Sequence, residues 1–257
     1  MRINGSIIGS VVTSSALSAT GIWGLQNVEL ANRLNVWPAQ IVTSGSVLFL
    51  DASNTNSYSG SGTTWYDLSG NGNTGTLTNG PTFSGVNGGS IVFDGVDDYV
   101  NIPYNASTIN FPTNNATVCV WYKVSTVGDG IGVLVTQRSS TGTGIQIYAD
   151  ATKLYADGGS TAGLYSTTII PNGTIAFGGI VFDKTNSLLK LYINGIYDSQ
   201  VSYTGNIQDT YPIRLGTGAF GDGPFPGNIY TVNVYNRSLT ATEILQNFSA
   251  IRTKFGV

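Results

Sequence analysis

The sequence predicts an all-β fold: a two-sheet antiparallel jelly-roll sandwich with an extended N-terminal arm and a short C-terminal helix. Three observations lead to this prediction. Short segments with alternating or β-branched residues follow one another closely from residue 46 onward. Turn-forming dipeptides separate them, in a chain that contains 34 glycines and 14 tyrosines. Helical periodicity is nearly confined to the C-terminus, so the class is a sandwich of sheets.

The expected strands are short segments enriched in Val, Ile, Leu, Tyr and Phe. They cover residues 47–51, 90–94, 98–102, 117–124, 132–137, 144–149, 153–158, 175–183, 188–195 and 227–236.

Asn-Gly and Asp-Gly dipeptides lie between these strands and are strong signals for two-residue hairpin turns. Asn-Gly occurs at 79–80, 87–88, 172–173 and 194–195, and Asp-Gly at 94–95, 129–130, 157–158 and 222–223. We therefore expect hairpins at these positions.

The two ends of the chain differ from the strand-rich part. Residues 1–44 combine small polar residues with scattered apolar side chains and cannot bury two tryptophans on their own, so they predict an attachment arm that precedes a domain at 45–257. Near the other end, Thr240 and Glu243 have the spacing of a helix capping box. The apolar residues that follow fall on one helical face. They are Ile244, Leu245, Phe248 and Ile251.

The composition excludes several classes of function. Charged residues make up 10% of the chain, its net charge is -3, and no run of Lys or Arg exists, which argues against nucleic-acid binding. No stretch approaches the length of a membrane span, so we expect no membrane insertion. Histidine is absent, which removes the commonest general base and metal ligand. Cys119 lies in an apolar run and is interpreted as a buried structural thiol of a protein that folds in a reducing cytoplasm.

Four blocks, in their order and spacing, resemble the LamG-like jelly roll of the concanavalin A-like lectin/glucanase superfamily. They are WYDLSGNGNTGTLTNGPTF (65–83), GGSIVFDGVDDYVNIP (88–103), LKLYINGIYDS (189–199) and PFPGNIYTVNVYNRSLTATEI (224–244). The resemblance implies two antiparallel sheets, one of them concave, in a family that binds carbohydrate or protein.

The N-terminal segment resembles the leaders of structural proteins of tailed bacteriophages, through a Gly-Ile-Trp-x-Leu stretch and a later Trp-Pro. This resemblance implies that the arm docks on other virion proteins. The expected attachment residues are its apolar anchors. They are Ile22, Trp23, Leu25, Leu30 and Trp37.

Glucan hydrolases of the superfamily carry two glutamates and an aspartate at alternate positions of one strand, because retaining hydrolysis needs two closely spaced carboxyl groups. This chain has only two glutamates, Glu29 in the arm and Glu243 in the helix cap. Neither lies on an expected strand, and we therefore expect a protein that is not an enzyme.

Three carboxylates, Asp94, Asp97 and Asp98, crowd the connection between two expected strands. Aspartate at a turn start caps backbone N–H groups, and Gly95 supplies a positive φ, so a structural turn accounts for all three. Two alternatives stay open: a calcium site, since hard oxygens cluster in such turns, and a catalytic site. In calcium-dependent pentraxin-type relatives, a loop that corresponds to residues 216–227 supplies ligands. The carboxylate that this loop offers is Asp222.

Sugar binding needs aromatic rings beside polar groups, because the C–H faces of sugars stack on rings. Tyr148, Tyr155 and Tyr165 lie near two polar loops, and Asp129, Gln137 and Asp157 lie close to them in the sequence. These six residues form the candidate carbohydrate site. The alternative is that tyrosine only suits strands, which is a strong alternative in a chain with 14 of them.

Together these observations predict a non-enzymatic structural protein of a phage virion, either a capsid decoration or a tail or fibre adhesin, assembled in the host cytoplasm and present in several copies. Its jelly roll would be displayed for host attachment through surface carbohydrate. The alternative is a free-standing carbohydrate-binding module or bacterial lectin. Such a protein would usually show a secretion signal or a linker to an enzyme, and neither is evident.

Overall fold

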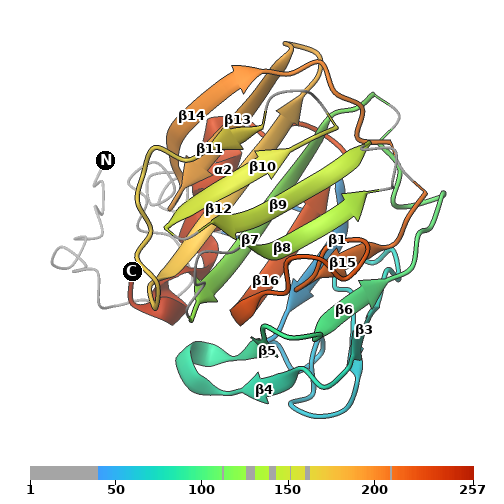
Figure 1. Ribbon diagram of the computed structural model, residues 1–257, viewed down its shortest axis with the longest axis vertical. Helices are drawn as coiled ribbons and strands as arrows, with labels where there is room; N and C mark the ends of the chain where they lie inside the picture. Colours follow the sequence, from blue (N-terminus) through green and yellow to red (C-terminus); the bar gives the residue numbers. More distant parts are fainter. Residues whose placement is uncertain are drawn as a thin grey trace, which may run out of the picture. The chain divides into compact units, whose positions relative to one another are not determined.

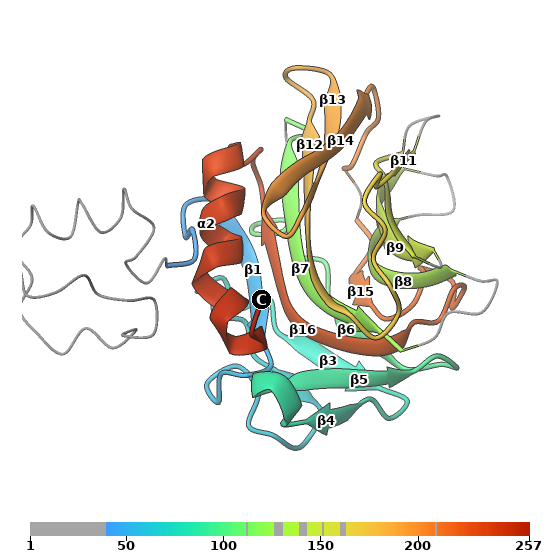
Figure 2. The ribbon, with the colours of Figure 1, turned by 90° about the vertical axis from the view of Figure 1, so that its left-hand side faces the viewer.

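Two antiparallel sheets face each other across one apolar core in the computed structural model (Figures 1 and 2). The structure describes residues 40–111, 113–125, 131–138, 143–150, 152–159, 163–208 and 210–257. The expected attachment residues Ile22, Trp23, Leu25, Leu30 and Trp37 lie outside the described residues, and so does Asp129. The division into an arm at 1–44 and a domain at 45–257 stays a prediction.

Sheet A contains eight strands within the described part of the chain. In spatial order they are β14 (Ile196–Ser202), β13 (Leu188–Ile193), β12 (Ile175–Asp183), β7 (Ala116–Val124), β16 (Pro226–Tyr235), β5 (Ser90–Asp94) and β4 (Thr82–Ser84), with β1 (Ser46–Asp51) paired to the second half of β16. The first half of β16 pairs with β5, so β5 and β1 share one side of this long strand.

Sheet B also contains eight strands in the described ranges. Their order is β11 (Leu164–Tyr165), β10 (Lys153–Asp157), β9 (Gly144–Asp150), β8 (Ile131–Arg138), β15 (Ile213–Leu215), β6 (Tyr99–Ile102), β3 (Gly75–Thr78) and β2 (Thr64–Trp65). The expected two-sheet antiparallel architecture is confirmed.

Outside a bulge in β8, the side chains of sheet B alternate between the core and the outer face. Ile145, Ile147 and Ala149 of β9 are buried in the core, whereas Gln146 and Tyr148 between them are only partly buried. Strands of sheet A are apolar on both faces, because their outer face is covered as well. In β7, for example, Val118 and Val120 face sheet B while Trp121 packs on the opposite side.

The outer face of sheet A is covered by α2 (Ala241–Ile251), which is followed by the short 3-10 helix η2 (Arg252–Phe255) (Figure 2). The expected capping box is confirmed: Glu243 N–H donates to the Thr240 hydroxyl, and the Glu243 carboxylate accepts from Thr240 N–H. Phe248 stacks on Trp121 with ring centroids 5.4 Å apart. Of the four residues expected on the apolar face, Ile244, Phe248 and Ile251 are buried, whereas Leu245 is exposed.

The first described residues pack against the same helical layer. Val42 is buried; its N–H donates to Asn247 Oδ1 and its carbonyl accepts from the Tyr235 hydroxyl, both at 2.9 Å. Asn247 Nδ2 also donates to the Tyr235 hydroxyl. This polar clamp fixes residue 42 to both β16 and α2.

Most of the expected hairpin turns are instead connections between the two sheets. Asn194-Gly195 does form a tight hairpin between β13 and β14, with φ values of 50° and 78°. The stretch Asp94–Asp98 was expected to be a hairpin, and this is wrong: β5 lies in sheet A and β6 in sheet B. Jelly-roll chains pass repeatedly from one sheet to the other, and such a crossing uses the same turn residues as a hairpin.

No helix among the described residues is long and apolar enough to cross a membrane.

Candidate functional site

Three tyrosines form a row across the outer face of sheet B. Tyr148 on β9 pairs in register with Tyr155 on β10, and Tyr155 pairs with Tyr165 on β11. Since directly opposed residues of antiparallel strands project to the same face, the three rings lie side by side. We call Tyr148, Tyr155 and Tyr165 the tyrosine row.

The rings of the row pack on one another. Tyr155 stacks on Tyr148 at a centroid distance of 4.2 Å and an interplanar angle of 24°, and lies 4.7 Å from Tyr165. The hydroxyl oxygens of Tyr148 and Tyr165 are 3.4 Å apart. Burial raises the pKa of Tyr148 and of Tyr155 above the usual value, so these hydroxyls stay protonated and can donate hydrogen bonds. Tyr165 has 43% of its surface exposed, which makes it the ring of this row most open to a ligand.

A polar group lies beside the tyrosine row on the same face. Gln146 and Asp157 are paired across β9 and β10, two residues from Tyr148 and Tyr155. The Arg138 guanidinium from β8 donates to both side chains, at 3.2 Å from the Asp157 carboxylate. The face therefore places a neutralised ion pair and an amide next to the rings. Such groups can bind the hydroxyls of a sugar while the rings cover its C–H face.

Gly163 lies directly against the tyrosine row. A Cβ atom at this position would lie 1.8 Å from the Tyr155 hydroxyl oxygen, so a larger residue would displace this ring. The Tyr165 carbonyl then accepts from the Ser199 hydroxyl on β14, which ties the edge of sheet B to sheet A.

Four of the six predicted carbohydrate-binding residues are brought together here. They are Tyr148, Tyr155, Tyr165 and Asp157. Gln137 is buried instead, and its Nε2 donates to the Tyr211 carbonyl. Arg138 and Gln146 were not among the predicted residues.

A β-bulge explains why Gln137 does not share the face of the row. In β8, Val133 pairs with Tyr148 but Val135 pairs with Ile147, so the register shifts between them. The extra residue reverses which side chains point outward. Without the bulge, Gln137 would lie on the same face as Val133. With the bulge, Arg138 lies on that face. The place of Gln146 on this face could have been predicted from the sequence, because Gln146 is two residues from Tyr148 in an alternating strand.

A second aromatic group lies on the same face of sheet B. Arg214 of β15 has its guanidinium 5.1 Å from the centroid of Tyr99 on β6, and its Nη1 donates to the Ala219 carbonyl. Phe220, which follows Ala219, is 64% exposed and lies 6.4 Å from the ring of Tyr211. We call Tyr99, Tyr211 and Phe220 the rim aromatics.

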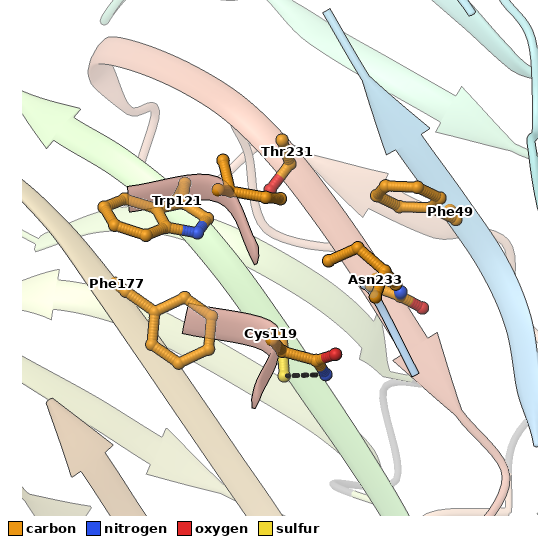
Figure 3. A pocket seen from close by; sticks show the side chains of 9 residues that line it. Phe49, Cys119, Trp121, Phe177, Thr231 and Asn233 are labelled. Carbon is orange, nitrogen blue, oxygen red and sulfur yellow. Dashed lines mark hydrogen bonds between the residues drawn. The ribbon is translucent and has the colours of Figure 1, made fainter. Parts of the chain in front are cut away.

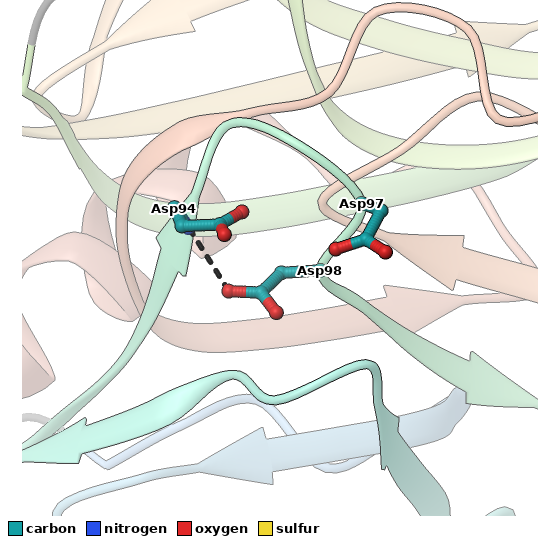
Figure 4. Close-up of side chains that lie close together, drawn as sticks. All are labelled: Asp94, Asp97 and Asp98. Atoms are coloured by element: carbon teal, nitrogen blue, oxygen red, sulfur yellow. Dashed lines mark hydrogen bonds between the residues drawn. The ribbon is translucent and has the colours of Figure 1, made fainter.

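The aspartates of the β5–β6 connection form a compact carboxylate cluster (Figure 4). Ligand oxygens of Asp94, Asp97 and Asp98 lie within 4.8 Å of one another. Asp94 N–H donates to Asp98 Oδ2 at 3.0 Å, and Val96 N–H donates to Asp94 Oδ1 at 2.8 Å. Burial, and then the charges of Asp94 and Asp97, raise the pKa of Asp98.

These contacts are those of the expected structural turn, with Gly95 at a φ of 78°. Asp222 does not belong to this carboxylate cluster and binds its own loop: its Oδ1 accepts from Phe220 N–H. Calcium binding by Asp94 and Asp222 therefore stays a prediction.

A small cavity lies under α2, between the helix and sheet A (Figure 3). Its lining includes Trp121, Phe177 and Cys119, and Asn247 Nδ2 lies 3.7 Å from the Cys119 sulfur. Burial raises the pKa of the Cys119 thiol to about 12, so it is protonated and unreactive at neutral pH. We interpret this cavity as a packing gap within the apolar layer.

Residues 94–245, more than half of the chain, match the sequence pattern of a protein family described as the concanavalin A-like lectin/glucanases superfamily. The chain belongs to this superfamily. Membership confirms what the four sequence blocks indicated, and the two facing sheets fit it. No match to the chain was found among curated protein sequences.

Several solved structures share the two-sheet architecture of this chain at low sequence identity. The binding domain of Paraclostridial Mosquitocidal Protein 1 is 18% identical at a TM-score of 0.62, with 80% of this chain and 52% of that one covered. The receptor-binding domain of botulinum neurotoxin type G is 13% identical at a TM-score of 0.61, with 79% and 51% covered. The chain thus spans about half the length of these two toxin domains.

A third similar structure matches over almost its whole length. It is domain 4 of AbnA, a GH43 extracellular arabinanase from Geobacillus stearothermophilus, in complex with arabinotriose. It is 19% identical at a TM-score of 0.59, with 79% of this chain and 97% of that domain covered. At these identities the likeness establishes the fold alone.

Proposed function

We propose that this chain is a non-enzymatic, lectin-like binding protein that takes neutral carbohydrate on the outer face of sheet B. The observation that carries the proposal is the exposed ring of Tyr165, at the end of a tyrosine row with hydrogen-bonding groups beside it. A neutral ligand is favoured because Arg138 already pairs with Asp157, which leaves no excess charge in this group. Binding domains among the similar structures agree with this class of function.

The non-enzymatic part of the proposal is supported by the state of Glu243. Its carboxylate is bonded to Arg237 at 2.6 Å and lies in the cap of α2, far in the sequence from the tyrosine row. The hydrogen bond from Arg237 lowers the pKa of Glu243 to about 2. A carboxyl group that is ionised and capped in this way does not serve as a general acid near neutral pH.

The virion role is the finer part of the proposal. Its support is the resemblance of the N-terminal segment to phage leaders, which concerns residues such as Trp23 and Trp37 outside the described ranges. Under this proposal the chain attaches to capsid or tail proteins through residues 1–44, in several copies, and presents sheet B to host-surface glycans. The alternative keeps the binding face but makes the chain a free-standing carbohydrate-binding module or bacterial lectin.

Titration of the full chain with a panel of neutral oligosaccharides that includes arabinotriose tests the binding function. We expect at least one ligand to bind and Tyr165→Ala to weaken its affinity about fivefold, since one aromatic contact of this kind contributes about 1 kcal/mol. The matched control is Tyr66→Ala, because Tyr66 is 53% exposed and follows β2 at the opposite edge of sheet B. Equal losses in the two variants, or no binding of any neutral oligosaccharide, would overturn the proposal.

A further inference from the structure

The outer face of sheet B carries two aromatic groups, and they lie on different strands. The tyrosine row occupies β9, β10 and β11, whereas the rim aromatics belong to β6 and to the segments around β15. Since β8 lies between β9 and β15, each group is separate from the other.

Both groups project from the same side of the sheet. Ile213 and Leu215 face the core, so Arg214 between them points outward, and it reaches the ring of Tyr99 on the neighbouring strand. Val133, which pairs with Tyr148, donates its N–H to the Gly223 carbonyl. This bond and the Arg214–Ala219 bond hold the loop that carries Phe220 against β8 and β15.

The floor between the two groups is polar in part. Arg138 on β8 and Gln146 on β9 are only partly buried on this side, whereas Val133 and Thr136 of β8 are buried. A ligand that touches both aromatic groups would therefore cross hydrogen-bonding side chains between two stacking positions.

The width of this face sets the size of the ligand. Five strand-to-strand steps separate β11 from β6, and at about 4.8 Å each they span about 24 Å. This distance is several times the size of one sugar ring, so a single terminal sugar would leave one of the aromatic groups without a contact.

We propose that this face takes an extended segment of a neutral linear polysaccharide, which stacks on Tyr165 at one end and on the rim aromatics at the other. The inference rests on the proposed carbohydrate function and adds the length and direction of the ligand, across the strands of sheet B. An extended peptide fits less well, because peptides pair with the free edge of a sheet through main-chain hydrogen bonds, and this surface is a face.

The test measures affinity against ligand length. The full chain is titrated calorimetrically with oligosaccharides of increasing length, from disaccharide to octasaccharide. They are built from the same sugar units as the neutral oligosaccharide that binds best in the panel. We expect affinity to rise over the first several sugar units and then level off. The contact with the rim aromatics adds to the contact with Tyr165 only when the ligand is long enough to reach both. Phe220→Ala should lower the ratio of octasaccharide to disaccharide affinity about fivefold. Phe220 is 64% exposed, so the variant should unfold at the wild-type temperature.

Tyr66→Ala again serves as the matched exposed aromatic control and should keep the wild-type ratio. Affinity that is the same for disaccharide and octasaccharide, or a ratio that Phe220→Ala does not change, would overturn the extended-ligand inference and leave carbohydrate binding intact. Absence of binding to every oligosaccharide, or displacement of a bound oligosaccharide by an unstructured peptide with higher affinity, would overturn the carbohydrate proposal as well.

Discussion

Tyr155→Ala is expected to reduce oligosaccharide affinity more than any other single substitution in the tyrosine row. Tyr155 lies between Tyr148 and Tyr165, at centroid distances of 4.2 Å and 4.7 Å. Its removal leaves both neighbours without the ring that positions them. The ligand contact of Tyr155 and that of Tyr165, whose ring would no longer be held in place, together contribute about 2 kcal/mol to binding, which corresponds to a roughly thirtyfold loss in affinity measured by calorimetric titration.

Tyr155→Phe is the matched control for this prediction. It keeps the ring and its stacking and removes only a hydroxyl, so binding should stay within about threefold of wild type. Tyr155 faces away from the core, and both variants should therefore remain folded by circular dichroism. Wild-type affinity in a folded Tyr155→Ala protein would show that the row is not the binding surface.

Asn247→Ala is expected to give the largest loss of stability among polar substitutions in the α2 layer. Asn247 is buried, accepts from Val42 N–H, and donates to the Tyr235 hydroxyl. Alanine would leave the Val42 N–H without its partner in an apolar layer, and would also enlarge the cavity beside it. Together these effects should lower the free energy of unfolding by about 3 kcal/mol in chemical denaturation.

Leu245→Ala on the same helix provides the comparison. Leu245 is exposed and lies on the opposite side of α2 from the cavity, so its replacement should cost less than about 1 kcal/mol. If Asn247→Ala unfolds with the wild-type free energy, the polar clamp between residue 42, β16 and α2 does not stabilise the domain.

The long strands could be predicted from the sequence because their patterns are local. Residues 90–94 and 175–183 were expected as strands, and β5 and β12 have those bounds. Among the strands with two to four residues, β6 was expected at 98–102 and the others were missed, because alternation needs a longer window than Thr64–Trp65 or Ile213–Leu215 provides. The same Asn-Gly dipeptide lies in a hairpin at Asn194-Gly195 and in a crossing between sheets at Asn79-Gly80, because the partner of the next strand is decided by distant residues.

The candidate site could be predicted in part for the same reason. Tyr148, Tyr155 and Asp157 follow the alternation of their strands, and their placement together depends only on pairing neighbouring strands. The exchange of Gln137 for Arg138 depends on the bulge after Val133, where the strand meets the Gly223 carbonyl. The rim aromatics depend on how the loop after β15 folds back, which no local pattern in residues 216–225 specifies.

The most direct test of the central claim is hydrogen–deuterium exchange of the full chain with and without the best-binding oligosaccharide. If the outer face of sheet B is the binding surface, peptides that cover residues 144–157 and 163–168 should exchange more slowly in the complex. Peptides of α2, on the far side of sheet A, should exchange at the same rate in both states. Protection confined to α2 or to the Asp94–Asp98 connection would contradict the account and place the ligand on another surface.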